Sequence, residues 1–323
     1  RRGNSPISIF PIFTPIISAK IIILTLKGYF SNTHLLSKFF LLFGLIIISY
    51  IIHTLLAIFT VYLSFEVGVN LCFPPYDLSS VVSVNVAKII QFLGSIGFFI
   101  TPILIYGYLV NFEFNFKKSI SRQSILIVLV IMVLITPLVS FLLEWNMAIN
   151  VPDWISEYDK KSDDIVLAFL KMNNYWDLVF NIIILAIIPA IGEELLFRGL
   201  LQQSLIKKIG DIHIAIFITA LIFSAFHLHF SGLFPRILLG LVLGYLFYWS
   251  KSLWIPIIAH FLNNAMFVVV SYPNFKSFNF IQNDQHLDSS IVNDTSIYLA
   301  FFSFISVMLL MFLFYKNSRI KKD

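Results

Sequence analysis

The chain contains eight long apolar stretches, each close to the length of a helix that crosses a bilayer. Such a helix needs about 20 mostly apolar residues. Of the 323 residues, only 12% are charged, whereas a soluble domain carries about 25% charged residues. We therefore expect an all-α, polytopic integral membrane protein with about eight transmembrane helices. The stretches are 39–65, 89–110, 125–143, 177–207, 212–230, 233–250, 253–272 and 297–315.

The connections between these stretches alternate in charge. Basic residues gather in alternate connections, where they mark the cytoplasmic side of a membrane protein. This alternation predicts eight spans with both termini in the cytoplasm, and we expect the membrane to be a bacterial cytoplasmic membrane. The connection 144–176 mixes both signs and is expected to include a short interfacial helix. The basic connections are 20–38, 117–122, 207–208, 251 and 316–322, and the acid-leaning ones are 66–77, 144–164 and 284–294.

The pattern divides the chain into four parts. Residues 1–38 form an N-terminal cytoplasmic segment, of which 1–26 have doubtful status because no Met precedes Met132. Residues 39–176 hold three spans and an extracytoplasmic loop. Residues 177–272 hold four spans and are expected to form the catalytic core, and 273–323 hold a second extracytoplasmic loop, the last span and a basic cytoplasmic tail.

Composition excludes some sites and partners. Cys72 is the only cysteine, so the chain can form neither an intramolecular disulfide nor a metal site made of cysteines alone. A nucleic-acid surface would show a basic stripe with interleaved aromatic residues, and the sequence has none. We expect the bilayer and a membrane-associated peptide or protein as partners, and no nucleic acid.

Three charged residues interrupt the fourth stretch at Glu193, Glu194 and Arg198. Charges inside a membrane helix cost several kcal/mol unless they are paired or hydrated. Glu194 and Arg198 are four residues apart, so they share a helix face and can form an ion pair. Glu193 points about 100° away from Glu194. It has no cation on its own face, and an unpaired buried carboxylate takes up a proton or serves a function.

Polar residues in the next stretches lie at a similar depth. At 1.5 Å per residue, Glu193 lies roughly 21 Å along its helix from Lys207, and His227 roughly 22 Å from the start of the fifth stretch. His260 and Asn264 lie roughly 14 and 20 Å from the end of the connection at 251. Scattered structural polar residues need not share a depth. We therefore predict one polar chamber inside the membrane.

Other polar residues in the apolar stretches have simpler interpretations. We expect His53 to be a core residue bonded to a backbone carbonyl. Arg236 is expected to reach the membrane surface along its own stem, or else to pair with a carboxylate of the site. Asn263 is turned away from the face of His260, and we leave it outside the site.

Three motifs resemble those of an intramembrane protease family, the type II CAAX prenyl proteases and bacteriocin-processing enzymes. They read Glu-Glu-xxx-Arg, Phe-xxx-His and His-xxx-Asn on successive helices. Here they begin at Glu193, Phe223 and His260, intact and in order, within 177–270. Any one of them is weak, but the ordered set within membrane spans is specific.

The resemblance implies a glutamate-dependent endopeptidase that uses no metal or other cofactor. Glu193 would be the general base that activates water, and His227 would hold that water and move its proton. His260 and Asn264 would form the oxyanion hole, while Glu194 and Arg198 would support the site. The chemistry agrees with this: burial raises the pKa of a carboxylate toward the range that a general base needs, and an amide is an oxyanion donor that needs no protonation.

Two alternatives stay open on the sequence. Glu193, His227 and His260 are a set of three ligands that a catalytic zinc could use, although the His-Glu-x-x-His helix of many zinc proteases is missing. A non-enzymatic transporter, scaffold or bacteriocin-immunity protein could use the same residues to relay protons or to bind an ion. The natural substrate, and whether it is prenylated, cannot be read from the motifs.

Overall fold

The structure is a computed structural model and describes residues 26–116, 120–273 and 294–320. Within these ranges the regular elements are all helical. The expectations for residues 1–25, 117–119, 274–293 and 321–323 fall outside the described residues. The α-helices are α2 (Leu35–Phe65), α3 (Val81–Ser95), α4 (Thr101–Val110), α5 (Arg122–Leu134), α6 (Thr136–Met147), α7 (Asp153–Phe169), α8 (Tyr175–Ile182), α9 (Ile188–Glu194), α10 (Gln203–Ile209), α11 (Ile212–Phe226), α12 (Leu233–Ser250), α13 (Trp254–Val270) and α14 (Asp294–Ile320).

The helices confirm a polytopic membrane protein. Six helical stretches of the described chain are long and apolar enough to cross a membrane: 35–65, 81–110, 122–147, 175–209, 230–250 and 297–318. The other two predicted spans are the shorter helices α11 and α13, of 15 and 17 residues. The fifth stretch was therefore predicted too long. Its helix ends at Phe226 because Leu228 takes a left-handed backbone conformation with φ of 50°, which an α-helix cannot continue.

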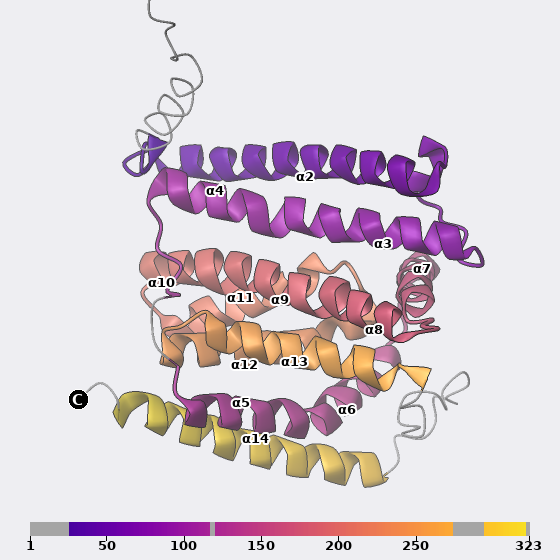
Figure 1. The fold of residues 1–323 in the computed structure, drawn as a ribbon. Coiled ribbons are helices and arrows are strands. Elements are labelled where there is room, and N and C mark those ends of the chain that lie inside the picture. The colour runs from indigo at the N-terminus through magenta and orange to yellow at the C-terminus, as the bar shows by residue number, and fades with distance from the viewer. Residues whose placement is uncertain (1–25, 117–119, 274–293, 321–323) are drawn as a thin grey trace, which may run out of the picture.

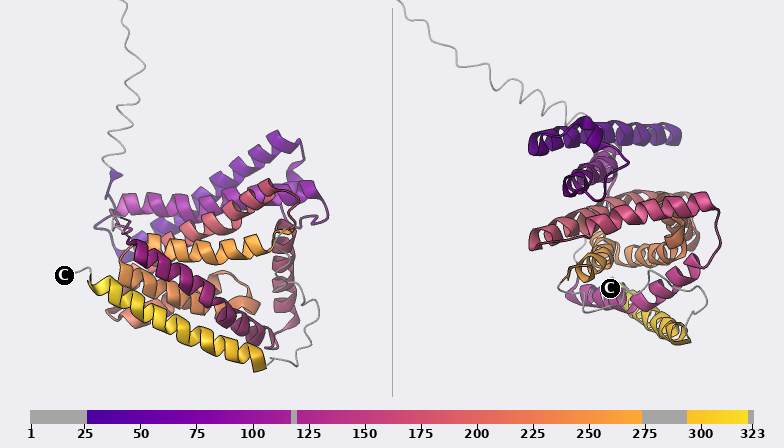
Figure 2. Two further views of the ribbon diagram at one scale, coloured as in Figure 1. Left: turned by 60° about the horizontal axis from the view of Figure 1, so that its bottom comes forward. Right: turned by 90° about the vertical axis from the view of Figure 1, so that its right-hand side faces the viewer.

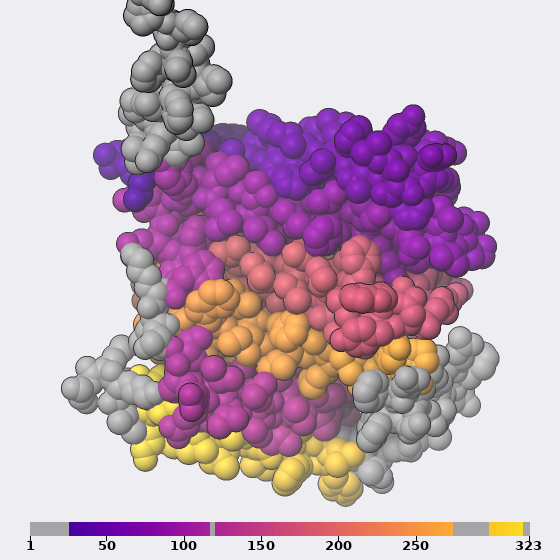
Figure 3. All heavy atoms as spheres, viewed as in Figure 1, coloured from indigo at the N-terminus to yellow at the C-terminus, as the bar shows by residue number. Residues whose placement is uncertain are grey.

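The long helices lie side by side in layers (Figures 1 and 2). From top to bottom in Figure 1 the layers are α2, then α3 with α4, then α8–α10 with α11, then α12 with α13, then α5 with α6, and last α14. The space-filling view shows these layers closely stacked (Figure 3). The layers that carry the three motifs therefore lie between the N-terminal helices and the pair formed by α5–α6 and α14.

Two apolar clusters fix the middle layers. Ile131, Met132 and Phe314 belong to a buried cluster that joins α5 and α14 to α12 and α13. Ile103 and Leu195 belong to a second buried cluster, which joins α4 and the α8–α10 helix to α12 and α13. Because each cluster contacts α12 and α13, these helices hold a fixed position beside the helix that carries Glu193.

Three of the long helices are not regular α-helices throughout. A π-helical segment at Ile96–Ile100 joins α3 to α4 just before Pro102. Two more, Ile183–Ile187 and Leu195–Gln202, flank α9. The helix at 122–147 is interrupted at Ile135, just before Pro137. Proline lacks the N–H that a helix interior needs, and π segments occur often at functional sites.

The expected helix in the 144–176 connection is α7, which runs across the ends of the long helices (Figures 1 and 2). It carries most of its charges on exposed positions but buries Asp159. Trp154 is 72% exposed, as expected for an aromatic side chain at a membrane interface. This helix therefore closes the side of the molecule opposite the ends of α4 and α10.

Candidate functional site

Glu193 and Glu194 are neighbours at the end of α9, but they face different surroundings. Successive residues of a helix are turned by about 100°. Glu194 points to the interior between helices and is fully buried. Glu193 is 12% exposed and lines a cavity. Two neighbouring glutamate side chains therefore lie in different environments.

Glu194 belongs to a closed cluster of charges. Its Oε1 accepts a 2.7 Å hydrogen bond from Arg198, whose guanidinium is also fully buried and donates to the carbonyl of Gly240 at 3.2 Å. The same Oε1 lies 2.9 Å from Nδ1 of His260. The guanidinium stacks 4.6 Å from the ring of Phe223. The predicted ion pair is confirmed, but it is not self-contained, because His260 shares the carboxylate.

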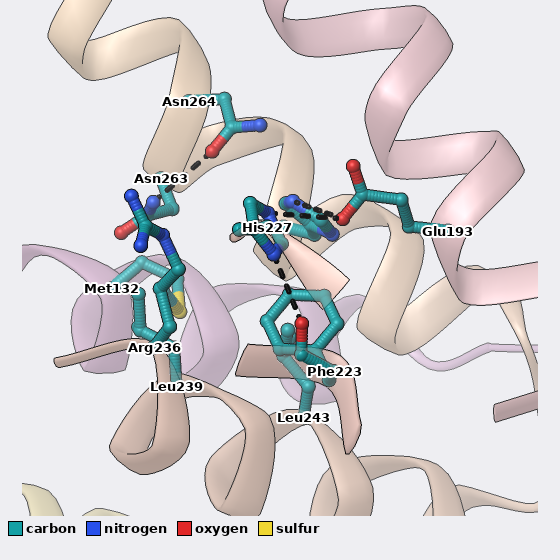
Figure 4. Close-up of a pocket in the computed structure, with 10 residues that line it drawn as sticks. Met132, Glu193, Phe223, His227, Arg236, Leu239, Leu243, Asn263 and Asn264 are labelled. Atoms are coloured by element: carbon teal, nitrogen blue, oxygen red, sulfur yellow. Dashed lines mark hydrogen bonds and ion pairs between the residues drawn. The ribbon is translucent and has the colours of Figure 1, made fainter. Parts of the chain in front are cut away.

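Glu193 faces the two histidines across a gap (Figure 4). Its Oε2 lies 3.8 Å from Nε2 of His227 and 3.9 Å from Nε2 of His260. Both distances exceed that of a direct hydrogen bond. This oxygen is buried and has no hydrogen-bond partner among the described residues. Polar groups at this separation can share a bridging water.

The partners of the two Nδ1 atoms determine which group each histidine presents to the gap at Nε2. Nδ1 of His227 lies 2.9 Å from the carbonyl of Phe223, which can only accept, so Nδ1 carries the proton. Nδ1 of His260 faces the Glu194 carboxylate and carries a proton for the same reason. A neutral His227 therefore presents an acceptor at Nε2. His260 presents an acceptor when neutral and a donor when protonated.

The cavity between these residues has a volume of about 120 Å³, and a water molecule in the liquid occupies about 30 Å³. It can therefore hold a few waters or the backbone of an extended peptide. Three of the helical layers contribute to its wall. The lining residues are Met132, Glu193, Phe223, His227, Arg236, Leu239, Leu243, His260, Asn263 and Asn264.

The two asparagines of α13 lie on the same cavity. Asn264 donates from Nδ2 to the carbonyl of Leu185 at 3.2 Å, which leaves its second N–H for a ligand. Asn263 donates to Oδ1 of Asn264 at 3.1 Å and lines the cavity itself. Leaving Asn263 outside the site was therefore wrong. Helical periodicity turned it off the His260 face, but the cavity is wide enough to reach both faces.

Two other polar residues of the apolar stretches have defined places. Nδ1 of His53 lies 2.8 Å from the carbonyl of Ser49, which confirms the expected core histidine. Arg236 lines the cavity, and its terminal nitrogens lie against His229; that it reaches the membrane surface stays an expectation. Arg236 does not pair with a carboxylate within 4 Å, as far as the described residues show.

His227 follows the end of α11, and a short loop leads from it to α12. Two buried side chains from other helices hold this loop. Asp159 of α7 accepts from the backbone N–H groups of Phe230 and Ser231, at 3.1 and 2.7 Å, and from the Ser231 hydroxyl at 2.7 Å. Asn146 of α6 donates to the carbonyl of Phe230 at 3.0 Å and accepts from the N–H of Phe234 at 3.0 Å.

The Asp159 carboxylate is held in its charged form. Burial alone raises its pKa, but the hydrogen bonds from Ser231 and Phe230 outweigh burial and leave the pKa below the ordinary value of an aspartate. Sequence reasoning missed both Asp159 and Asn146. The first lay among other charges of a polar connection, and the second among the polar residues that follow the third stretch, so neither showed the isolation that marks Glu193.

Comparison with known proteins finds similarity in the central helices. Residues 175–266 match the family model of type II CAAX prenyl endopeptidase Rce1-like proteins. A protein of Bacillus subtilis strain 168, named uncharacterized protein YpbD, is 31% identical over 113 residues, which make up 34% of this chain and 54% of that protein. The chain thus spans about half the length of that relative. No solved structure matches the chain.

The matched segment begins with α8, ends within α13 and contains all three motifs that carry the resemblance. It is also the segment that contributes nine of the ten side chains around the cavity, Met132 being the other. Residues 175–266 are therefore the part of the chain that is similar to type II CAAX prenyl endopeptidase Rce1-like proteins.

Proposed function

We propose that this protein is an intramembrane endopeptidase in which Glu193 activates water for attack on a peptide bond. The observation that carries the proposal is the convergence of Glu193, His227 and His260 on one gap, at 3.8 and 3.9 Å from the Glu193 oxygen. A water in this gap can donate hydrogen bonds to Glu193 and to Nε2 of His227. Both acceptors then pull charge onto the oxygen that attacks.

The attack forms a bond between the water oxygen and the carbonyl carbon of the peptide, and the water proton passes to Glu193. His227 then accepts this proton from Glu193 at Nε2 and delivers it to the leaving nitrogen as the C–N bond breaks. The developing oxyanion needs donors. His260 supplies one at Nε2 when its ring carries both protons, and Asn264 supplies another from the N–H that Leu185 does not use.

The supporting role of Glu194 and Arg198 follows from their burial. The pair holds the ring of His260 by its Nδ1, and this contact orients Nε2 toward the gap. Phe223 lies between the imidazole rings, with centroids 5.1 Å from His227 and 5.9 Å from His260. These contacts fix the geometry on which the reaction depends.

Water suits this gap better than zinc. Ligands of one tetrahedral zinc, bound at about 2.0–2.1 Å, lie about 3.4 Å apart, which is less than the two separations to Glu193. No group of three or more His, Cys, Asp or Glu side chains in the described part of the chain is placed to hold a metal ion. Cleavage that persists after exhaustive chelation is the expected result.

The substrate is a membrane-associated peptide or protein, and the chain would act in a bacterial cytoplasmic membrane with both termini inside. The test uses the full chain in detergent with a library of apolar peptides, and mass spectrometry identifies the products. The wild type cleaves a subset of the library, and Glu193→Gln cleaves none. Products that form equally in the Glu193→Gln sample would contradict the assigned base.

A further inference from the structure

The cavity has two chemically different walls (Figure 4). On one side Glu193 and Nε2 of His227 offer acceptors, and Nε2 of His260 lies beside them. On the other side lie hydrogen-bond donors: the guanidinium of Arg236 and the amide of Asn263, with Asn264 beyond them. The reaction proposed above uses the first wall and Asn264. It gives no role to Arg236 or to Asn263.

Arg236 keeps most of its donors free. Its two terminal nitrogens contact His229 only, at 2.9 Å to the carbonyl and 3.4 Å to Nδ1. A guanidinium has five N–H groups and stays charged at any ordinary pH, so three of them have no partner among the described residues. No carboxylate of those residues lies within 4 Å. The carboxylates that act on Arg236, those of Asp163, Asp159 and Glu193, do so from beyond 4 Å. The free N–H groups of a partly buried cation can therefore bind an anion.

The position of this guanidinium is built by its neighbours. A Cβ at Gly232 would lie 2.6 Å from the central carbon of the Arg236 guanidinium, so any larger residue there would displace the guanidinium from this position. His229 must accept from Arg236 at Nδ1, and its Nε2 therefore donates to Asp163 at 3.0 Å. His229 and Gly232 both belong to the loop between α11 and α12, which Asp159 holds through its hydrogen bonds to Ser231.

We propose that Arg236, assisted by Asn263, is a specificity-determining residue that binds a carboxylate of the substrate peptide close to the bond that is cut. The carboxylate belongs either to the end of the peptide or to an acidic side chain. Arg pairs with carboxylates through two parallel hydrogen bonds, and the small cavity keeps this group near the reacting carbon. The inference rests on the proposed peptidase function, because it assigns part of the same cavity.

Binding is measured first, because it does not depend on turnover. The full chain with Glu193→Gln is titrated in detergent with a fluorescent alanine- and leucine-rich peptide in three forms: a free acid, a terminal amide, and an amide with one internal aspartate. The free acid or the aspartate form binds about tenfold or more tightly than the plain amide, and which form does so identifies the source of the carboxylate. Adding Arg236→Gln removes the preference, whereas adding Arg122→Gln, an exposed arginine at the start of α5, leaves it unchanged.

A second variant, at Gly232, keeps Arg236 but changes the position of its guanidinium. Gly232→Ala displaces the guanidinium from its place and reduces the same preference, even if Arg236→Gln alters the fold. Cleavage of the best library peptide as acid and as amide then shows the preference in KM more than in kcat. Equal binding of all three forms, or binding of none, overturns the proposal. A carboxylate preference that depends on Arg236 without any cleavage would instead keep the subsite and overturn the peptidase function.

Discussion

Glu194 and Glu193 are neighbours in the chain, but they differ in burial and in hydrogen-bond partners. Around Glu194, Arg198 and His260 contact one carboxylate oxygen at 2.7 and 2.9 Å, and the carboxylate and the guanidinium are fully buried. Around Glu193 no group of the described residues lies within hydrogen-bond distance of Oε2, and a cavity opens beside it. We call these the closed side and the open side. The closed side holds structure, and the open side leaves a carboxylate available for a reaction.

This contrast shows how one helix serves both purposes. A charge that is paired within the protein stabilises the packing of helices but cannot take a proton from a substrate water. A charge left without a partner costs stability, and a protein keeps it only where it acts. Substitutions on the two sides should therefore affect different measurements, and the predictions below use that difference.

The largest effect is expected on the open side, at His227. Substitution of His227→Ala should lower the cleavage rate by about 10²–10⁴-fold, which is typical for loss of a general acid–base group. The melting temperature should change little, because the side chain is 30% exposed and its one hydrogen bond goes to a backbone carbonyl. Cleavage assays and thermal unfolding of one preparation check both. A large fall in melting temperature would place His227 on the closed side.

The closed side is tested at Arg198. Substitution of Arg198→Met leaves the Glu194 carboxylate buried without its cation and should lower the free energy of unfolding by about 3–5 kcal/mol. Denaturant unfolding in detergent measures this. The double substitution with Glu194→Leu should recover a large part of the loss, because it removes both charges. Simple addition of the two single effects would show that the pair does not interact.

A smaller effect is expected at Asp159, which supports the open side through the loop after His227. Substitution of Asp159→Asn should cost about 1–3 kcal/mol at neutral pH, as for other hydrogen bonds to a charged group. The folded pKa of Asp159 is lowered, so its contribution is present above the ordinary pKa of about 3.9 and is lost as pH falls through the folded pKa. The melting temperatures of wild type and variant should converge in acid. A difference that stays constant with pH would contradict the assigned charge.

The smallest effect is expected at Asn263. Substitution of Asn263→Ala removes one hydrogen bond to Asn264 and should reduce cleavage less than tenfold, since a net hydrogen bond contributes about 1 kcal/mol. Substitution of Asn264→Ala is the matched change, and it should reduce the rate by about 10²-fold if this amide stabilises the oxyanion. Equal effects at the two positions would remove the distinction between them.

Much of the fold could be predicted because the length of an apolar stretch indicates whether its helix can cross a membrane. Apolar length gave six of the eight spans, and charge spacing gave the Glu194–Arg198 pair. The prediction of one shared cavity also succeeded, because depth along a helix follows from counting residues. The fifth span was too long because hydropathy does not register the left-handed turn at Leu228.

The rest of the site depends on contacts between distant segments. Asp159 lies 72 residues from Ser231 along the chain, and nothing local marks either as a partner. That Arg236 lines the same cavity as Glu193 could not be predicted, because a sequence does not show which helices pack around that cavity. Asn263 was left out because helical periodicity gives directions around one helix but not the width of a cavity.

The most direct test compares Glu193→Gln with Glu194→Gln in one experiment that records cleavage rate and melting temperature together. Both changes replace a carboxylate with an amide of the same size on neighbouring residues. The structure predicts that Glu193→Gln abolishes cleavage and leaves the melting temperature nearly unchanged, whereas Glu194→Gln lowers the melting temperature markedly. Retained cleavage in Glu193→Gln, or an equal loss of stability in both variants, would contradict the assignment of Glu193 as the base.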